Sequence, residues 1–260
     1  MGSIRELLTR SPVTVSAPCR VDAGGTWDIK ALALPLEKKI PVTVNMALTL
    51  RTSVTLSPHD HGQVKISSRG FSHTETASAD RLPFDSPFGL FFAAVSYFGF
   101  DGLKVEIDSQ SPVKSALGGS STALVALLGA LREVTVLNDN RALSRKELLH
   151  LAYHLEDGIS GGNCGIQDQA AAVYGGVHLW KWHFGRWADP LTRISLLDKE
   201  GQEALSSHIL VAYSGKSHVA AQTNHQWVND FLSGKTRSGW INANGAVHSF
   251  ARAIQAGDWD

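Results

Sequence analysis

One stretch of the chain, residues 103–136, constrains the fold more than any other. Apolar residues alternate at Leu103, Val105 and Ile107, which predicts a half-buried strand. A loop of mostly small residues follows over 109–121, and an apolar run without proline from Thr122 predicts a helix. A strand, a glycine-serine loop and a helix start in this order aim several backbone N–H groups and the positive end of a helix dipole at one point. Such a point binds phosphate.

The same loop has a plainer interpretation, in which Ser120 or Ser121 caps the helix and the glycines only make a turn. We favour phosphate because the loop is long, rich in small residues and ends in two consecutive hydroxyls. The common nucleotide loops do not fit. The runs 215–217 and 234–236 lack the earlier glycine of the pattern G-x-x-x-x-G-K-[ST], and no G-x-G-x-x-G follows a strand.

Composition narrows the class of protein. The 260 residues carry 24 Lys and Arg against 24 Asp and Glu, so no net charge favours nucleic acid or an anionic membrane surface. Hydrophobic residues make up 43% of the chain, and we expect no window that approaches the length and hydropathy of a membrane-spanning segment. The N-terminus lacks the pattern of a signal peptide, which predicts a cytoplasmic location, and Cys19 and Cys164 have no metal-binding spacing.

The rest of the chain predicts an α+β fold, because strands dominate its first half and helices its second. Ser86-Pro87 predicts an N-cap and first turn, and Ser144 with Glu147 forms a capping box. We expect strands over 13–21, 41–56 (one long strand or two joined by a bend), 63–67, 103–107, 177–182 and 208–213. We expect helices over 88–98, from 122 onward, over 144–158 and 168–174, and through most of 219–256.

A second candidate site lies between Glu156 and Gln169. A glycine-rich linker separates Glu156, near a helix end, from Asp168, near a helix start. Taken singly, Glu156 could be a solvated surface residue and Asp168 an N-cap. Phosphoryl transfer, however, needs one carboxylate that holds a metal ion and another that faces the attacking hydroxyl, and this stretch offers both.

Three motifs together resemble the GHMP kinases, the superfamily of galactokinase, homoserine kinase, mevalonate kinase and phosphomevalonate kinase. The loop Ala116-Leu117-Gly118-Gly119-Ser120-Ser121 is similar to their P-x-x-x-G-L-G-S-S motif, with Ala116 in place of a glycine. The run 164–169, Cys-Gly-Ile-Gln-Asp-Gln, and the small residues that follow it resemble the C-G-I-M-D-Q and Q-D-Q-x-A-A-x-x-G-G patterns of sugar kinases. Near the N-terminus, the run 17–22 resembles A-P-G-R-V-N of galactokinases.

The resemblance implies a role for each matched residue. Asp168 is the expected catalytic base, and Arg20 is expected to pair with it and to stabilise the transferring phosphoryl group. Ser120 and Glu156 are the expected ligands of Mg²⁺. The ATP phosphates are expected over Ser115, Ala116, Leu117, Gly118, Gly119, Ser120 and Ser121.

A further loop, residues 23–28, resembles the A-G-G-x-x-D segment of fucokinases and heptose-phosphate kinases, although it lies one residue closer to Arg20. It implies substrate contacts from Gly25, Thr26 and Asp28, and the resemblance adds Gly165. The segment 213–218 resembles part of the heptose kinases, or equally forms a strand-to-helix turn capped by Ser217. The loop over residues 23–28 argues against galactose as the substrate.

The resemblance implies a two-lobed fold with a mixed sheet and helices. The expected domains are an ATP-binding domain over residues 1–180 and a partial second α+β domain over residues 181–260. The family's third, glycine-rich motif is not present, so we expect a truncated form of a longer kinase.

The expected activity is ATP-dependent phosphorylation of a sugar or sugar phosphate, at its anomeric hydroxyl, by a monomer or homodimer. Two alternatives stay open. One is an isoprenoid or amino-acid kinase of the same superfamily. The other is a sugar- or nucleotide-binding regulator on the same fold.

Overall fold

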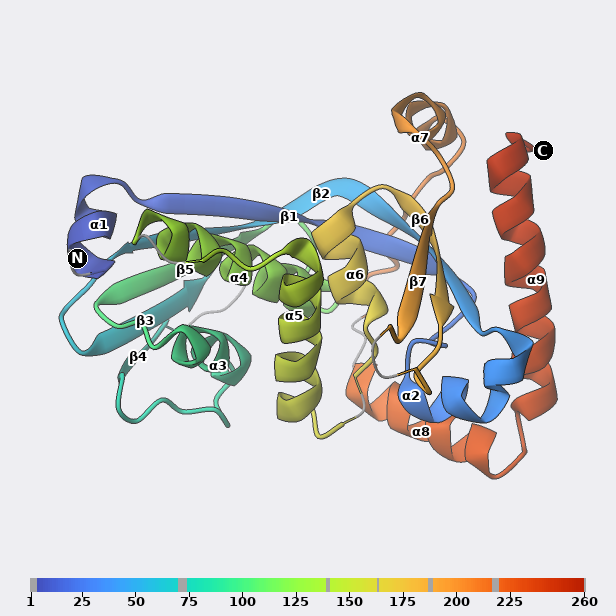
Figure 1. Ribbon diagram of the computed structural model, residues 1–260, viewed down its shortest axis with the longest axis horizontal. Coiled ribbons are helices and arrows are strands. Elements are labelled where there is room, and N and C mark those ends of the chain that lie inside the picture. The colour runs from blue at the N-terminus through green and yellow to red at the C-terminus, as the bar shows by residue number, and fades with distance from the viewer. Residues whose placement is uncertain are drawn as a thin grey trace.

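A seven-stranded mixed sheet forms the frame of the chain (Figure 1). The computed structural model describes residues 4–69, 74–138, 141–162, 164–186, 189–216 and 220–259, with the side chains of 220–222 excepted. The strands are β1 (Val13–Ala23), β2 (Val42–Pro58), β3 (Gln63–Ser68), β4 (Thr74–Ser78), β5 (Leu103–Ser109), β6 (Val177–Trp182) and β7 (Leu191–Ser195).

The long strand β2 is the centre of this sheet. It pairs with β1 along most of its length, with β5 over residues 52–58 and with β6 over residues 42–46, all antiparallel. The parallel pairing of β3 with β5 and the antiparallel edge strands β4 and β7 complete the order β4-β3-β5-β2-β6-β7. The alternation over 41–56 therefore forms one strand rather than two, because both of its halves have hydrogen-bonding neighbours.

The helices lie against this sheet and beyond one end of it (Figure 1). They are α1 (Ile4–Arg10), α2 (Lys30–Ala33) with the 3₁₀ turn η1 (Leu34–Lys39), α3 (Gly89–Phe98), α4 (Gly119–Leu137), α5 (Arg145–Ile159), α6 (Gln167–Tyr174), α7 (Lys199–Ser206), α8 (Ala220–Leu232) and α9 (Arg237–Ala256). Helix α4 packs on β1 and β2, and α6 packs beside it. The capping box of Ser144 and Glu147 begins α5, as the sequence predicts.

Three apolar clusters hold these layers together. The largest fills the space between the sheet and helices α3, α4 and α5, with Leu124, Leu127 and Phe92 fully buried. A second cluster is aromatic and joins α2, α5, α6, β6 and α8, and a third joins β2, β6 and β7 to α7 and α9. Because α8 and α9 pack through the second and third clusters, they are fixed to the same frame as the central loop.

The structure confirms most of the expected elements and corrects three expectations. Residues 208–213 form no strand, and Leu210 is 93% exposed. A strand needs a neighbour for its N–H and C=O groups, and no described strand lies beside this segment. Helix α3 begins at Gly89, and Ser86 accepts a hydrogen bond from the Phe88 N–H outside the helix. The strands β4 and β7 were not expected.

The third correction concerns the length and polarity of α4. Among the described residues, α4 is the one helix long and apolar enough to cross a membrane by length and composition. Its apolar side chains from Ala123 to Leu128 are buried against the sheet, so they form the core of the fold. The suggested cap residue Ser217 and the helix start at Val219 lie outside the described residues.

Candidate active site

The candidate phosphate loop, residues 110–118 and called the phosphate loop below, connects β5 to α4 and turns through three left-handed residues. Lys114, Ala116 and Gly118 have φ values of 58°, 62° and 72°. Gly118 is the N-cap of α4 and has no side chain to accept the first N–H groups of the helix, so Ser120 and Ser121 lie in the first turn instead of capping it. The helix start therefore offers N–H groups to an external anion.

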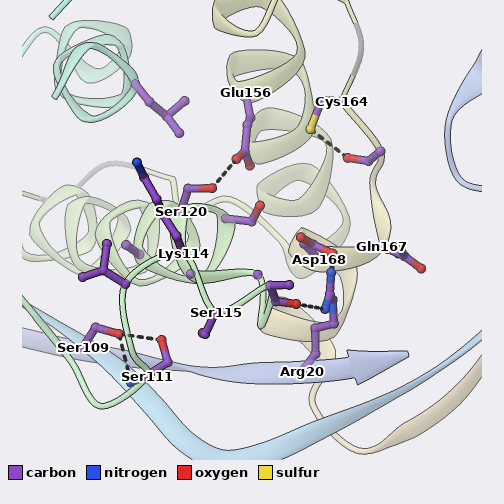
Figure 2. A pocket seen from close by; sticks show the side chains of 18 of the residues that line it. Arg20, Ser109, Ser111, Lys114, Ser115, Ser120, Glu156, Cys164, Gln167 and Asp168 are labelled. Carbon is purple, nitrogen blue, oxygen red and sulfur yellow. Dashed lines mark hydrogen bonds and ion pairs between the residues drawn. The ribbon is translucent and has the colours of Figure 1, made fainter. Parts of the chain in front are cut away.

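Arg20 joins this loop to Asp168 (Figure 2). Its Nε donates to Asp168 Oδ1 at 2.8 Å, and its Nη2 lies 2.7 Å from the same oxygen. Its Nη1 donates to the Ala116 carbonyl at 2.7 Å and lies 3.0 Å from Asp22 Oδ1. Burial alone would lower the pKa of Arg20, but the negative charges of Asp168 and Asp22 outweigh it and raise the pKa. The guanidinium therefore holds two carboxylates and the loop in one arrangement.

The backbone of β1 helps to aim this arginine. The register of β1 against β2 shifts between Pro18 and Arg20, and the Arg20 N–H leaves the ladder to donate to the Leu117 carbonyl at 3.3 Å. Such irregularities redirect side chains next to active sites. Both the main chain and the side chain of Arg20 thus contact the phosphate loop.

Glu156 lies under the first turn of α4 and is buried. Its Oε1 accepts from the Ser120 hydroxyl at 2.9 Å, and its Oε2 accepts from Gln169 Nε2 at 2.7 Å. Burial raises the pKa of Glu156, and hydrogen bonds from Ser121 and Ser120 oppose that rise. A hydroxyl and a carboxylate beside this candidate phosphate-binding helix start match the oxygen ligands that Mg²⁺ prefers.

Asp28 occupies a buried position behind Asp168. Its Oδ2 accepts from the Gln167 N–H at 3.0 Å, while its Oδ1 has no partner among the described residues. Burial raises the pKa of Asp28 to about 7, helped by the charges of Asp168 and Asp22 and opposed by the Gln167 hydrogen bond. Gly165 makes room for this carboxylate, because a β-carbon at 165 would overlap Asp28 Oδ2. Near neutral pH, the Asp28 carboxyl group is therefore present in both its protonated and its ionised form.

These groups line one cavity of about 720 Å³. Figure 2 shows Ser109 and Ser111 on one side of the loop and Asp168, Gln167 and Cys164 on the other. The lining near α3 and β5 is mostly apolar and consists of Ser68, Pro87, Leu90, Phe91, Ile107, Val113 and Ala123. The lining near β1 and α6 is acidic and holds Asp22, Asp28 and Asp168. The cavity would match an apolar group near α3 and β5, phosphate groups over the loop, and a polar group near β1 and α6.

The structure brings together twelve of the expected site residues along this cavity. They are Arg20, Thr26, Asp28, Ser115, Ala116, Gly118, Gly119, Ser120, Ser121, Glu156, Gly165 and Asp168. Leu117 lines a smaller neighbouring cavity instead. Gly25 is not among the lining residues either, because its α-carbon faces α9, where a β-carbon would lie 2.7 Å from the Trp240 ring.

Sequence reasoning missed four residues that belong to this site. Asp22 and Gln169 lie inside the motifs quoted above. The available signal was the acid and amide chemistry of their side chains, which in the structure contact Arg20 and Glu156. Lys114 lay within the phosphate loop. Trp227, on α8, has no motif around it, so only the fold could place it at the cavity.

Comparison with known proteins finds a family match and several relatives for parts of this chain. The family described as GHMP kinases N terminal domain matches residues 89–176. A mevalonate kinase of Thermococcus onnurineus is 29% identical over 154 residues, which are 53% of this chain and 45% of that protein. A D-glycero-alpha-D-manno-heptose 7-phosphate kinase of Campylobacter jejuni is 28% identical over 179 residues, 66% of this chain and 51% of that protein.

The other curated relatives are mevalonate kinases, and the chain spans about half the length of the curated relatives it matches. Among solved structures, Streptococcus pneumoniae phosphomevalonate kinase in complex with phosphomevalonate and AMPPNP superposes with a TM-score of 0.70 at 13% identity. The match covers 94% of this chain and 74% of that one. Residues 89–176 therefore match the GHMP kinase N-terminal domain, and the chain as a whole has the α+β fold seen in GHMP kinase structures.

Proposed function

We propose that this site transfers the γ-phosphoryl group of ATP to a hydroxyl of a small-molecule acceptor. The observation that carries the proposal is the contact of one arginine, Arg20, with both the phosphate loop and Asp168. The adenine ring would lie against the apolar lining near α3, and the phosphates over 115–121. The acceptor would then approach Asp168 from the acidic side of the cavity.

In this arrangement the chain contributes mainly position and charge, as phosphoryl transfer requires. The Asp168 carboxylate would orient the acceptor hydroxyl and take its proton. The guanidinium of Arg20 would hold that carboxylate in place and add positive charge beside the transferring group. The N–H groups at the start of α4 would bind the phosphate oxygens.

Glu156 and Ser120 are the residues that would hold Mg²⁺, which neutralises phosphate charge when bound. The described residues contain no cluster of three or more His, Cys, Asp or Glu side chains that could hold a metal by themselves. Mg²⁺ commonly uses one or two carboxylates together with substrate phosphates, so one carboxylate and one hydroxyl fit it.

The acceptor is an alcohol of one of two kinds. The names of most relatives favour mevalonate, an isoprenoid precursor with a carboxylate. The motifs over 23–28 and 164–169 and the heptose-phosphate relative favour a sugar or sugar phosphate.

A coupled ADP-release assay with the purified chain tests both. The panel is mevalonate, phosphomevalonate, heptose 7-phosphate, fucose and galactose. Acceptor-dependent ADP release supports the proposal and identifies the kind of acceptor. ATP binding without ADP release from any of the five would favour the regulator on the same fold.

A further inference from the structure

The tryptophan of α8, Trp227, is the one aromatic side chain on α8 or α9 among the described residues that line the cavity. It is 37% exposed, whereas Trp27, beside Asp28 in the chain, is 1% exposed. A large apolar ring that remains partly exposed in the lining of a cavity is available for a ligand.

A chain of edge-to-face contacts holds this indole in position. The rings of Trp227 and Trp240 are 6.0 Å apart at 75°, and those of Trp240 and Trp27 are 5.3 Å apart at 74°. Trp27 in turn meets Phe231 at 6.1 Å and 88°. Because Trp240 also packs on Gly25, the aromatic series is tied to the loop that carries Asp28. The Trp227 indole is therefore held in position by neighbouring rings and does not move freely at the surface.

Two polar atoms in the residues on either side of Trp27 have no partner among the described residues. They are Asp28 Oδ1 and Thr26 Oγ1, both buried and both in residues that line the cavity. Buried polar atoms without partners are costly unless a ligand satisfies them. An acceptor that fits would present hydroxyls to these atoms and a flat apolar face to the indole.

The charge of this region restricts the acceptor further. Its carboxylates are Asp22, Asp28 and Asp168, and the N–H groups of its one guanidinium are engaged by Asp168, Asp22 and the Ala116 carbonyl. The other lining cation, Lys114, lies on the Ser120 side of the loop (Figure 2). An acceptor carboxylate placed beside Asp28 would meet negative charge, with no unengaged cation on this side among the described lining residues, whereas a neutral hydroxyl would not be repelled.

We infer that Trp227 is a specificity-determining residue that stacks on the ring of a sugar-type acceptor while Asp28 and Thr26 bind its hydroxyls. The inference rests on the proposed function and deepens it, since it selects a cyclic polyol over an open-chain acid. Nothing in the motifs of the chain assigns a role to α8.

The test compares wild type with Trp227→Ala and Trp227→Phe, and uses Phe250→Ala as a matched control. Phe250 is 39% exposed on α9 and does not line the cavity. Calorimetry with AMPPNP present measures the binding of heptose 7-phosphate, fucose, galactose and mevalonate. The ADP-release assay measures KM for the acceptor and for ATP.

We expect Trp227→Ala to weaken binding of the sugar ligand and to raise its KM by about tenfold. KM for ATP should not change, Trp227→Phe should restore most of the affinity, and Phe250→Ala should behave as wild type. Unchanged sugar affinity in Trp227→Ala overturns the inference, and so does wild-type protein that binds mevalonate but none of the sugars. Sugar binding that depends on Trp227 without ADP release keeps the inference and overturns the kinase proposal instead.

Discussion

Gly118 and Asp168 lie next to each other in the fold, although they are 50 positions apart in the chain. A β-carbon at 118 would be 3.3 Å from both the carboxylate carbon and Oδ2 of Asp168. The N-cap of α4, the candidate phosphate-binding helix, and the candidate catalytic base are therefore neighbours, as a single transfer site requires.

This contact predicts that Gly118→Ala will impair the site twice. The residue has φ 72°, where an L-residue costs about 1–2 kcal/mol, and the new methyl group would press on Asp168. We expect lower thermal stability and a lower kcat. The control is Gly158→Ala, a helical position with open space around it, which should be neutral or stabilising. Wild-type kcat in Gly118→Ala would mean that Asp168 does not act from this position.

Replacement of Asp168 itself tests the base. Asp168→Asn keeps the shape of the side chain and an oxygen for Arg20, but it cannot take a proton. We expect kcat to fall roughly 100-fold to 10,000-fold, while AMPPNP binding measured by calorimetry stays near wild type. The half-exposed acid Asp108, which pairs with Arg69, supplies the control Asp108→Asn. Near-normal turnover in Asp168→Asn would remove the assigned base.

The left-handed Ala116 predicts a stabilising substitution. Its φ of 62° is a conformation that glycine adopts without the steric cost of a β-carbon. Ala116→Gly should therefore raise the free energy of unfolding by about 1 kcal/mol, measured by urea titration. Ala142→Gly, in a loop residue outside the left-handed region, should not stabilise the protein. A loss of stability in Ala116→Gly would contradict the assigned strain.

Asp28 predicts a pH dependence of stability. Its pKa is raised by burial to about 7 in the folded chain from 3.8, so the folded state retains a proton that the unfolded state has released. This group therefore lowers the free energy of unfolding as pH rises from about 4 to about 7. Asp28→Asn should remove that part of the decline. Denaturant titrations of both proteins at pH 5 and pH 8 measure it, and an identical pH slope in the two proteins would contradict the prediction.

Glu156 predicts a magnesium dependence. Glu156→Gln keeps a hydrogen-bond acceptor for Ser120 but removes the negative charge that would attract Mg²⁺. We expect the Mg²⁺ concentration for half-maximal rate to rise by roughly tenfold or more. Glu133→Gln, at an exposed acid on α4, is the control. If the two variants had the same Mg²⁺ dependence, Glu156 would have no part in binding the ion.

The sequence alone determined the local features of this protein, because they depend on residues close together in the chain. The strand, loop and helix over 103–136, the capping box at Ser144 and the long alternation of β2 all follow from periodicity and turn chemistry. The candidate residues Arg20, Ser120, Glu156 and Asp168 were found through their motifs.

Only the tertiary structure decided which of these residues meet, and what surrounds them. Residues 208–213 have the apolar composition of a strand, yet they form none, since a strand depends on a neighbour that composition cannot supply. In the sequence, Gly24 and Gly25 resemble part of a ligand-binding loop. In the structure, a side chain at either position would overlap Val247 or Trp240, which pack against the two glycines. Trp227 reaches the cavity only through the packing of α8 on the aromatic cluster, a long-range contact that leaves no pattern in the sequence.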